Sequence, residues 1–232
     1  MDVLLIDLDD TLIPDAAARD QAMSSTLAAF AATTRLPDVW RVVRGEWQAS
    51  GLRSTPALVG VSSWEALWTD FRAAVPDLTT QLAGDDYQAR VWNRILPEED
   101  SAVVGASFRG TREQLVRTFD WAPAALSSWA RTHDLWCVTN GSSWLQRRKL
   151  QLAGLGPTFR DVVISGEVGA EKSELRFHDE VASRSARLGV QPVAVIGDSA
   201  TSDGALASAL QVRYVQVAAG TDPSSDFHPP SR

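Results

Sequence analysis

Short apolar runs alternate with longer segments of mixed polarity over most of this chain. The first run, residues 3–6, has four consecutive apolar residues, which is typical of a strand buried on both faces and central in a parallel sheet. Four later runs are equally short, apolar and rich in β-branched residues, and they predict strands at Leu135–Thr139, Val162–Ser165, Val193–Gly197 and Val212–Val217. The intervening segments predict helices at Pro123–Arg131, Ser143–Leu152, Ser173–Leu188 and Ser202–Leu210. This alternation predicts an α/β fold in which a Rossmann-like parallel sheet lies between two layers of helices.

The segment 15–107 interrupts the alternation, because it contains predicted helices and no predicted strand. The helices are expected at Ala16–Thr33, Asp38–Gln48, Ser63–Ala74 and Thr79–Val91. Five of the nine tryptophans lie in this segment, and we expect them to pack in the core of a small bundle: Trp40, Trp47, Trp64, Trp68 and Trp92. We therefore predict a helical cap domain at 15–107, inserted into a core formed by 1–14 and 108–232. The tail after Gly220, with its prolines and serines, is expected to be loose.

Charge and composition narrow the range of partners. The net charge of −7 argues against a nucleic-acid partner, because such binding needs clustered cations. No apolar stretch reaches the ~20 residues of a membrane span. The first residues lack a basic leader and a cleavage site, so we expect no membrane association and a cytoplasmic location. The only cysteine, Cys137, lies in an apolar run and is expected to be a buried hydrophobic residue.

Lysine is rare in this chain. Of the 22 basic residues only two are lysines, Lys149 and Lys172, and the others are arginines. Where arginine is the usual cation, a lysine can mark a position that needs a compact ammonium group rather than a planar fork. Drift would give the same composition, so the position of each lysine decides between the two explanations.

Three acids follow the first predicted strand, at Asp7, Asp9 and Asp10. Like charges so close together repel one another, and a divalent cation relieves the repulsion. Mg²⁺ is the expected ion, because it prefers hard oxygen ligands and binds one or two carboxylates together with a phosphate. The first residues of the chain therefore predict a metal-assisted phosphoryl site at the open end of a sheet.

Polar residues also follow the other predicted strands. The second strand ends in Thr139, Asn140 and Gly141, a lysine follows the third at Lys172, and the fourth ends in Gly197 and Asp198, with Asp203 nearby. Ligands of open parallel sheets bind beyond the carboxyl ends of the strands. We therefore expect these residues, which are far apart in sequence, to meet at one edge.

The order and spacing of these marks resemble the haloacid dehalogenase-like (HAD) hydrolases, and more closely their phosphatase branch with a helical (C1-type) cap. The resemblance covers nearly the whole chain. It rests on four patterns: Asp7-x-Asp9-x-Thr11 after an apolar strand, Thr139 at a strand end, a lone Lys172, and Gly197-Asp198 followed by Asp203. One departure is Ser173, which stands where these proteins commonly have a proline after the lysine.

The resemblance implies that Asp7 is the nucleophile and forms an acyl phosphate, which splits one difficult displacement into two. It also implies that Asp9 is the general acid and base, protonating the leaving alkoxide and then deprotonating the attacking water. Residues i and i+2 of a regular strand share a face, so we expect both carboxylates to address one phosphorus. Asp10 is expected to point to the backbone or to solvent.

The resemblance further implies a Mg²⁺ site formed by the Asp7 side chain, the Asp9 backbone carbonyl and Asp198. Substrate-binding roles fall on Thr139, on amide groups near Asn140 and Gly141, and on the ammonium of Lys172. Asp203 and Thr11 are expected to contact these residues without binding metal or substrate themselves, and Asp203 is expected to orient a metal-bound water or Lys172.

Simpler explanations remain for single motifs. Asp9 and Asp10 could cap the next helix, residues 139–141 could be only a turn, Lys172 could be a solvated surface residue, and Asp203 could only open a helix.

The predicted function is that of a Mg²⁺-dependent phosphatase acting on a small phosphorylated metabolite. The alternatives are a dehalogenase, a phosphomutase, a phospho-accepting domain and a non-catalytic binding protein. An acid at Asp9 argues against a dehalogenase, since a halide leaves without a proton. Candidate recognition groups are Arg41, Arg44, Arg53 and the tryptophans of the predicted cap, and the sequence carries no signal for the substrate or the oligomeric state.

Overall fold

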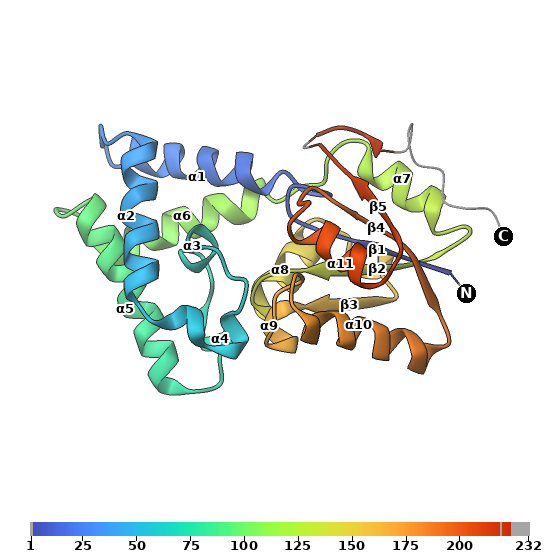
Figure 1. The fold of residues 1–232 in the computed structure, drawn as a ribbon. Helices are drawn as coiled ribbons and strands as arrows, with labels where there is room; N and C mark the ends of the chain where they lie inside the picture. The colour runs from blue at the N-terminus through green and yellow to red at the C-terminus, as the bar shows by residue number, and fades with distance from the viewer. Residues whose placement is uncertain (1, 219, 224–232) are drawn as a thin grey trace.

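The sheet at the centre of the fold has five parallel strands in the order β3-β2-β1-β4-β5, in a computed structural model that describes residues 2–218 and 220–223 (Figure 1). The strands are β1 (Asp2–Ile6), β2 (Asp134–Thr139), β3 (Asp161–Ile164), β4 (Gln191–Gly197) and β5 (Arg213–Gln216). The first strand is central, as its uninterrupted apolar run predicts. The predicted Rossmann-like α/β fold is confirmed.

Helices cover both faces of the sheet. The sheet lobe has four longer helices: α7 (Ala122–Trp129), α8 (Ser143–Leu152), α10 (Leu175–Leu188) and α11 (Asp203–Ala209). It also has two short ones, η3 (Gly156–Thr158) and α9 (Ser165–Val168). Alternate residues of β1 enter different cores, because successive side chains of a strand point to opposite faces. Leu4 and Ile6 pack in one core with residues of α7 and α8, whereas Val3 and Leu5 pack in the other with residues of α10 and α11.

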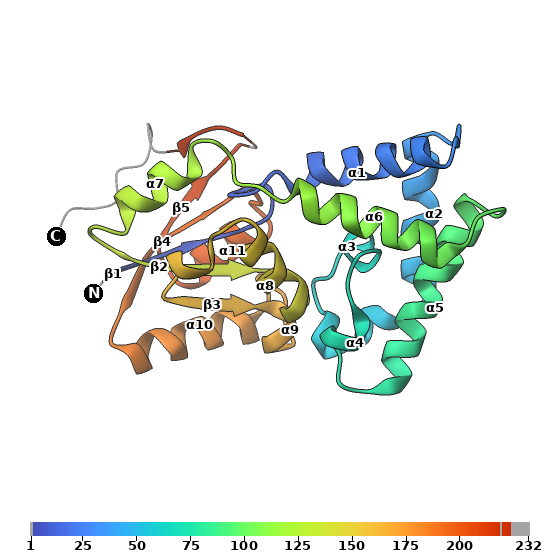
Figure 2. The same cartoon turned by 180° about the vertical axis from the view of Figure 1, so that it is seen from behind.

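Helices α1–α6, which we call the helical insertion, form a separate lobe beside the sheet (Figures 1 and 2). They are α1 (Asp15–Ala29), α2 (Leu36–Ala49), α3 (Ser63–Ala66), α4 (Phe71–Ala74), α5 (Leu78–Ile95) and α6 (Ser101–Leu115), with short 3₁₀ turns η1 (Leu52–Ser54) and η2 (Pro56–Leu58). Its core buries Trp40, Trp47, Trp68 and Trp92, and Trp64 packs against it partly buried. The expected role of these tryptophans in bundle packing is confirmed.

Helix α6 is the main element that the sequence pattern did not predict. Its first turn is fixed by Asp100, whose carboxylate accepts a hydrogen bond from the amide of Ala102 at 2.8 Å. Phe108 on this helix lies 5.4 Å from Trp92 between ring centroids, so tertiary packing stabilises a segment that two glycines weaken locally. The predicted domain boundary between residues 107 and 108 therefore falls inside a helix.

The predicted helix Ser63–Ala74 is wrong in one respect, because it is two short helices, α3 and α4. Asp70 interrupts it and begins the second helix, accepting a hydrogen bond from the Arg72 amide at 3.0 Å.

The expectation of a loose tail concerns mainly residues 224–232, which lie outside the described residues. Cys137 is buried in the core, as predicted. No helix in the described part of the chain is long and apolar enough to cross a membrane.

The packing of α4 on α5 gives a prediction. A Cβ atom at Gly84 would overlap the buried Phe71 ring, whereas one at Gly45 in α2 would meet nothing within 4 Å. We expect Gly84→Ala to destabilise the protein by about 1–3 kcal/mol through overpacking. Gly45→Ala, the matched control, should be neutral or stabilising by about 0.5–1 kcal/mol, because alanine favours helix more than glycine does. Urea unfolding of both variants measures the difference, and equal effects would contradict the packing described here.

Candidate active site

Asp7 stands at the carboxyl end of the central strand. Its amide continues the sheet ladder by donating to the carbonyl of Ile196 at 2.9 Å, which fixes the backbone just before the chain leaves β1. The following turn closes when the amide of Leu12 donates to the carbonyl of Leu8 at 2.9 Å, and both leucine side chains are fully buried. Asp7 is only 5% exposed, so its carboxylate is held in a fixed, largely dry position.

Lys172 joins the nucleophile candidate to a second acid. Its Nζ lies 2.5 Å from a carboxylate oxygen of Asp7 and 2.6 Å from one of Asp203. Its backbone amide donates to Oδ1 of Asn140 at 2.9 Å, which fixes the loop that carries it. Burial disfavours the ammonium form, but the two carboxylates outweigh this effect and raise the pKa of Lys172 above its usual value. Lys172 is therefore a buried cation, not a solvated surface lysine.

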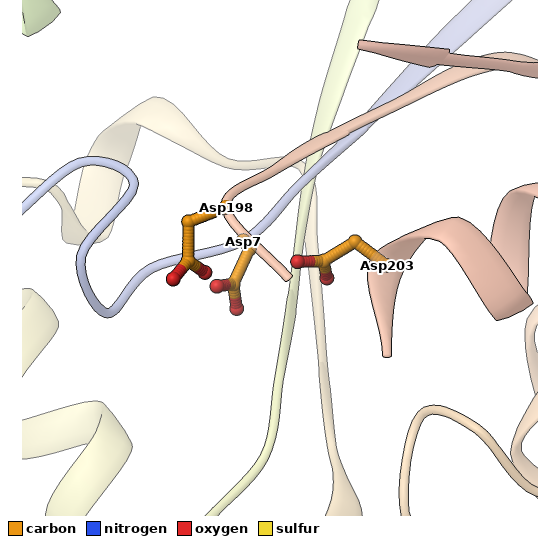
Figure 3. A group of neighbouring side chains, drawn as sticks. All are labelled: Asp7, Asp198 and Asp203. Carbon is orange, nitrogen blue, oxygen red and sulfur yellow. The ribbon is translucent and has the colours of Figure 1, made fainter. Parts of the chain in front are cut away.

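Asp198 directly follows β4 and Asp203 begins α11, and both carboxylates lie beside that of Asp7 (Figure 3). The amide of Asp198 donates to the hydroxyl of Thr11 at 3.0 Å, and that hydroxyl lies 3.4 Å from Asp7. A Cβ atom at Gly197 would overlap the carboxylate of Asp203, so only glycine allows this approach. Carboxylate oxygens of Asp7, Asp198 and Asp203 lie within 4.8 Å of one another.

The three acids carry more negative charge than Lys172 neutralises. Burial raises the pKa of Asp7 to about 6, with Lys172 opposing and Asp203 reinforcing the rise. Burial also raises the pKa of Asp198 to about 6, and the charges of Asp7 and Asp10 add to it. Such a site, built only of oxygen donors, fits a small divalent cation. Asp203 uses both of its oxygens, for Lys172 and for the amide of Ser199. Asp7 uses one oxygen for Lys172, and its other oxygen makes a long contact of 3.4 Å with the Thr11 hydroxyl, so Asp7 and Asp198 are the residues that could hold the cation.

The loop after β2 lies at the same edge of the sheet. The buried hydroxyl of Thr139 is 3.3 Å from Oε1 of Gln146 on α8. The amide of Gly141, however, donates to the hydroxyl of Ser165 at 2.8 Å. To bind a phosphoryl oxygen, as the resemblance implies, the Gly141 amide would first have to break its hydrogen bond to Ser165.

Asp9 lies differently from the expectation that it shares a face with Asp7. The strand ends at Ile6, so the two-residue period of a strand no longer governs the direction of the side chain at position 9. Both oxygens of the Asp9 carboxylate contact Nζ of Lys149, at 2.8 and 2.9 Å, and one lies 3.2 Å from Nε2 of Gln146. Its partners are thus distinct from those of Asp7.

Asp10 points to the backbone, as predicted. Its carboxylate accepts a hydrogen bond from the amide of Ala16 at 2.9 Å, close to the start of α1. Its backbone φ of 55° lies in the left-handed region, which aspartate adopts more readily than most other residues. The capping explanation therefore holds for Asp10 and not for Asp9.

Lys149 and Gln146 are the residues of this region that the sequence analysis did not place. Both are fully buried on α8, and Lys149 contacts Asp9, Asp15 and Glu65. Those three carboxylates outweigh the effect of burial and raise the pKa of Lys149 above its usual value. The available signal was the scarcity of lysine, because both lysines of the chain are buried among carboxylates.

The chain matches no protein-family model. It is 30% identical to a phosphoserine phosphatase of Thermus thermophilus over 237 aligned positions, which cover 96% of this chain and 91% of that protein. It is 26% identical to the pyrimidine 5'-nucleotidase PynA of Streptococcus pneumoniae, covering 86% of this chain and 76% of that protein. A third relative, the HAD-hydrolase YfnB of Bacillus subtilis, is 31% identical over 106 residues, less than half of either chain (46% and 45%).

Solved structures share the fold. The magnesium-bound structure of YfnB aligns with a TM-score of 0.62 at 20% identity and covers 93% of this chain and 88% of that one. An L-2-haloacid dehalogenase of Xanthobacter autotrophicus aligns with a TM-score of 0.58 at 17% identity, covering 94% and 77%. Together with the full-length similarity to the Thermus protein, these findings confirm the resemblance carried by the four motifs: the chain belongs to the haloacid dehalogenase-like superfamily of hydrolases.

Proposed function

We propose that the protein is a Mg²⁺-dependent phosphatase that hydrolyses a small phosphorylated metabolite through an aspartyl phosphate on Asp7. The observation that carries the proposal is the position of Asp7, buried at the end of the central strand between Lys172 and Asp198. The names of two relatives, a phosphoserine phosphatase and a pyrimidine 5'-nucleotidase, support a phosphomonoester as the substrate class.

In the first half of the proposed reaction, an Asp7 oxygen forms a bond to phosphorus while the bond from phosphorus to the ester oxygen breaks. The leaving alkoxide takes a proton from Asp9. In the second half, Asp9 removes a proton from water, the water oxygen bonds to phosphorus, and the Asp7–phosphorus bond breaks to release phosphate. General acid–base help of this kind contributes ~10²–10⁴ to the rate.

The surrounding residues supply positioning and charge. Lys172 offsets the negative charge of the nucleophile and of the phosphoryl group, and Asp203 holds its ammonium in place. When bound to Asp7 and Asp198, Mg²⁺ would screen the repulsion between an anionic nucleophile and an anionic phosphate. Thr139 ends β2 at the same edge of the sheet, and we assign its hydroxyl the role of binding a phosphoryl oxygen.

Dehalogenation is the competing reaction, because dehalogenases are among the proteins of similar fold. The carboxylate of Asp9 favours phosphate transfer, since an alkoxide needs a proton to leave and a halide does not. Release of halide from a 2-haloacid, without release of phosphate from any monoester, would overturn the proposal. A non-catalytic role would give neither product.

The nucleophile gives the first test of this function. Asp7→Asn should lower phosphate release from p-nitrophenyl phosphate by roughly 10⁴-fold or more, the scale on which enzymes lose rate with their nucleophile. Asp10→Asn is the matched control: it replaces an acid three residues away whose carboxylate accepts a bond from the amide of Ala16 at the start of α1, and it should stay within a few-fold of wild type. Near-normal turnover by Asp7→Asn would show that the assignment is wrong.

The metal gives a second test, read without turnover. A ligand at about 100 times its dissociation constant adds ~2.7 kcal/mol to stability, roughly 5–10 °C in Tm for a chain of this size. We expect saturating Mg²⁺ to raise the Tm of the EDTA-treated protein on this scale, and to leave that of Asp198→Asn nearly unchanged. Asp10→Asn should keep the Mg²⁺ effect. If Asp198→Asn gained as much as wild type, the ion would bind elsewhere.

A further inference from the structure

A second group of buried charges lies where the helical insertion meets the sheet lobe. At its centre is Lys149 of α8, which is 0% exposed. Its Nζ lies 2.7 Å from a Glu65 oxygen, 2.8 Å from an Asp9 oxygen and 3.2 Å from an Asp15 oxygen. Asp15 in turn pairs with the buried Arg112 at 2.5 Å. Glu65 lies on α3, Asp15 begins α1 and Arg112 lies on α6, so three carboxylates and two cations join the two lobes.

Removing one charge from this group would leave another buried charge without its partner. A buried charge is costly unless it is paired and hydrogen-bonded. Lys149 pairs with all three carboxylates, whereas Arg112 contacts only Asp15 among them. Without Lys149, Asp9 and Glu65 would lose their only ion-pair partner among the described residues and would repel each other across a largely dry space.

Asp9 is the most exposed of the three carboxylates. Its side chain is 24% exposed, whereas those of Glu65 and Asp15 are nearly closed off from solvent. Gln146 connects it to the phosphate-binding edge: Nε2 of Gln146 lies 3.2 Å from Asp9, and Oε1 accepts a bond from the Thr139 hydroxyl at 3.3 Å. The same Nε2 lies 2.8 Å from Glu65. Lys149 and Gln146 thus both contact Asp9 of the sheet lobe and Glu65 of the insertion.

We propose that Lys149 is a positioning residue for Asp9, and that Glu65 ties this position to the helical insertion. The proposal rests on the function proposed above, in which Asp9 is the general acid and base. Lys149 itself touches no reacting atom. It fixes the direction of the Asp9 carboxylate beside the Thr139 loop and keeps Glu65 within hydrogen-bonding distance. The position of the Asp9 carboxylate relative to the helical insertion is thereby fixed.

The test uses two substrates that need the acid to different degrees. The leaving group of p-nitrophenyl phosphate departs readily as an anion, whereas that of an alkyl phosphate such as glycerol phosphate needs a proton. If Lys149 acts through Asp9, Lys149→Met should lower the single-turnover rate of leaving-group release from the alkyl ester by roughly 10²-fold or more, the scale of lost acid–base help. Single-turnover release reports the first half of the reaction, because the hydrolysis of the aspartyl phosphate is common to both esters. Lys149→Met should lower this rate for the aryl ester by less than about 10-fold, and Asp9→Asn should show the same pattern.

A second variant tests the dependence on Asp9. In the double variant Lys149→Met with Asp9→Asn, the loss on the alkyl ester should be no greater than in Asp9→Asn alone, since both changes remove one effect. Arg148→Met is the matched control, because Arg148 is the neighbouring cation on α8 and pairs with Glu113 at 2.9 Å near the surface. Its activity on both esters should match wild type. Glu65→Gln should weaken the alkyl ester reaction by less than Lys149→Met does.

Three outcomes overturn the proposal. Equal losses on both esters in Lys149→Met, or additive losses in the double variant, would show a merely structural role. Wild-type rates in Lys149→Met would show that Asp9 needs no such partner. If Lys149→Met does not fold, the pair Lys149→Met with Glu65→Gln removes one charge of each sign and allows the same comparison. If the wild-type protein releases no phosphate from any ester, the proposed function is wrong. If the activity depends on Asp7 but Lys149→Met shows no ester-selective loss, only the role of Lys149 is wrong.

Discussion

The structure depends on holding several carboxylates together at the carboxyl edge of a parallel sheet. Two buried ammonium groups make this possible, Lys172 for Asp7 and Asp203, and Lys149 for Asp9, Asp15 and Glu65. A compact ammonium group has three donors that can be shared among several acids, which a planar guanidinium does less readily. The other Lys and Arg positions of the chain are all arginines, so the two lysines mark positions where one buried cation serves more than one carboxylate.

The fold and the core of the site follow from sequence because they depend on simple periodicities. An uninterrupted apolar run gives a central strand, and strand–helix alternation gives a parallel sheet whose carboxyl ends share one edge. Those two rules suffice to bring Asp7, Lys172 and Asp198 together from distant positions. The family resemblance adds roles to these residues, but their proximity already follows from the topology.

The direction of single side chains beyond the strand ends did not follow from sequence. The strand rule fails for Asp9 because the chain turns after Ile6, and the direction of its carboxylate is then set by Lys149 on a helix distant in sequence. Helix α6 was missed for a related reason. Its glycines weaken the local signal, and contact with α1, α5 and the Asp15–Arg112 ion pair, all tertiary, stabilises it.

The clusters around the two lysines differ in whether they include residues of the helical insertion. Asp7, Lys172 and Asp203 all belong to the sheet lobe, so the contacts of the Lys172 ammonium with both carboxylates do not depend on the insertion. Lys149 and Asp9 belong to that lobe as well, but their cluster is completed by Glu65 and Asp15 from the insertion. A displacement of the insertion would therefore disturb the partners of Asp9 and spare those of Asp7. In this fold the Asp7 carboxylate is fixed by the sheet lobe, and the Asp9 carboxylate is held by the junction between the two lobes.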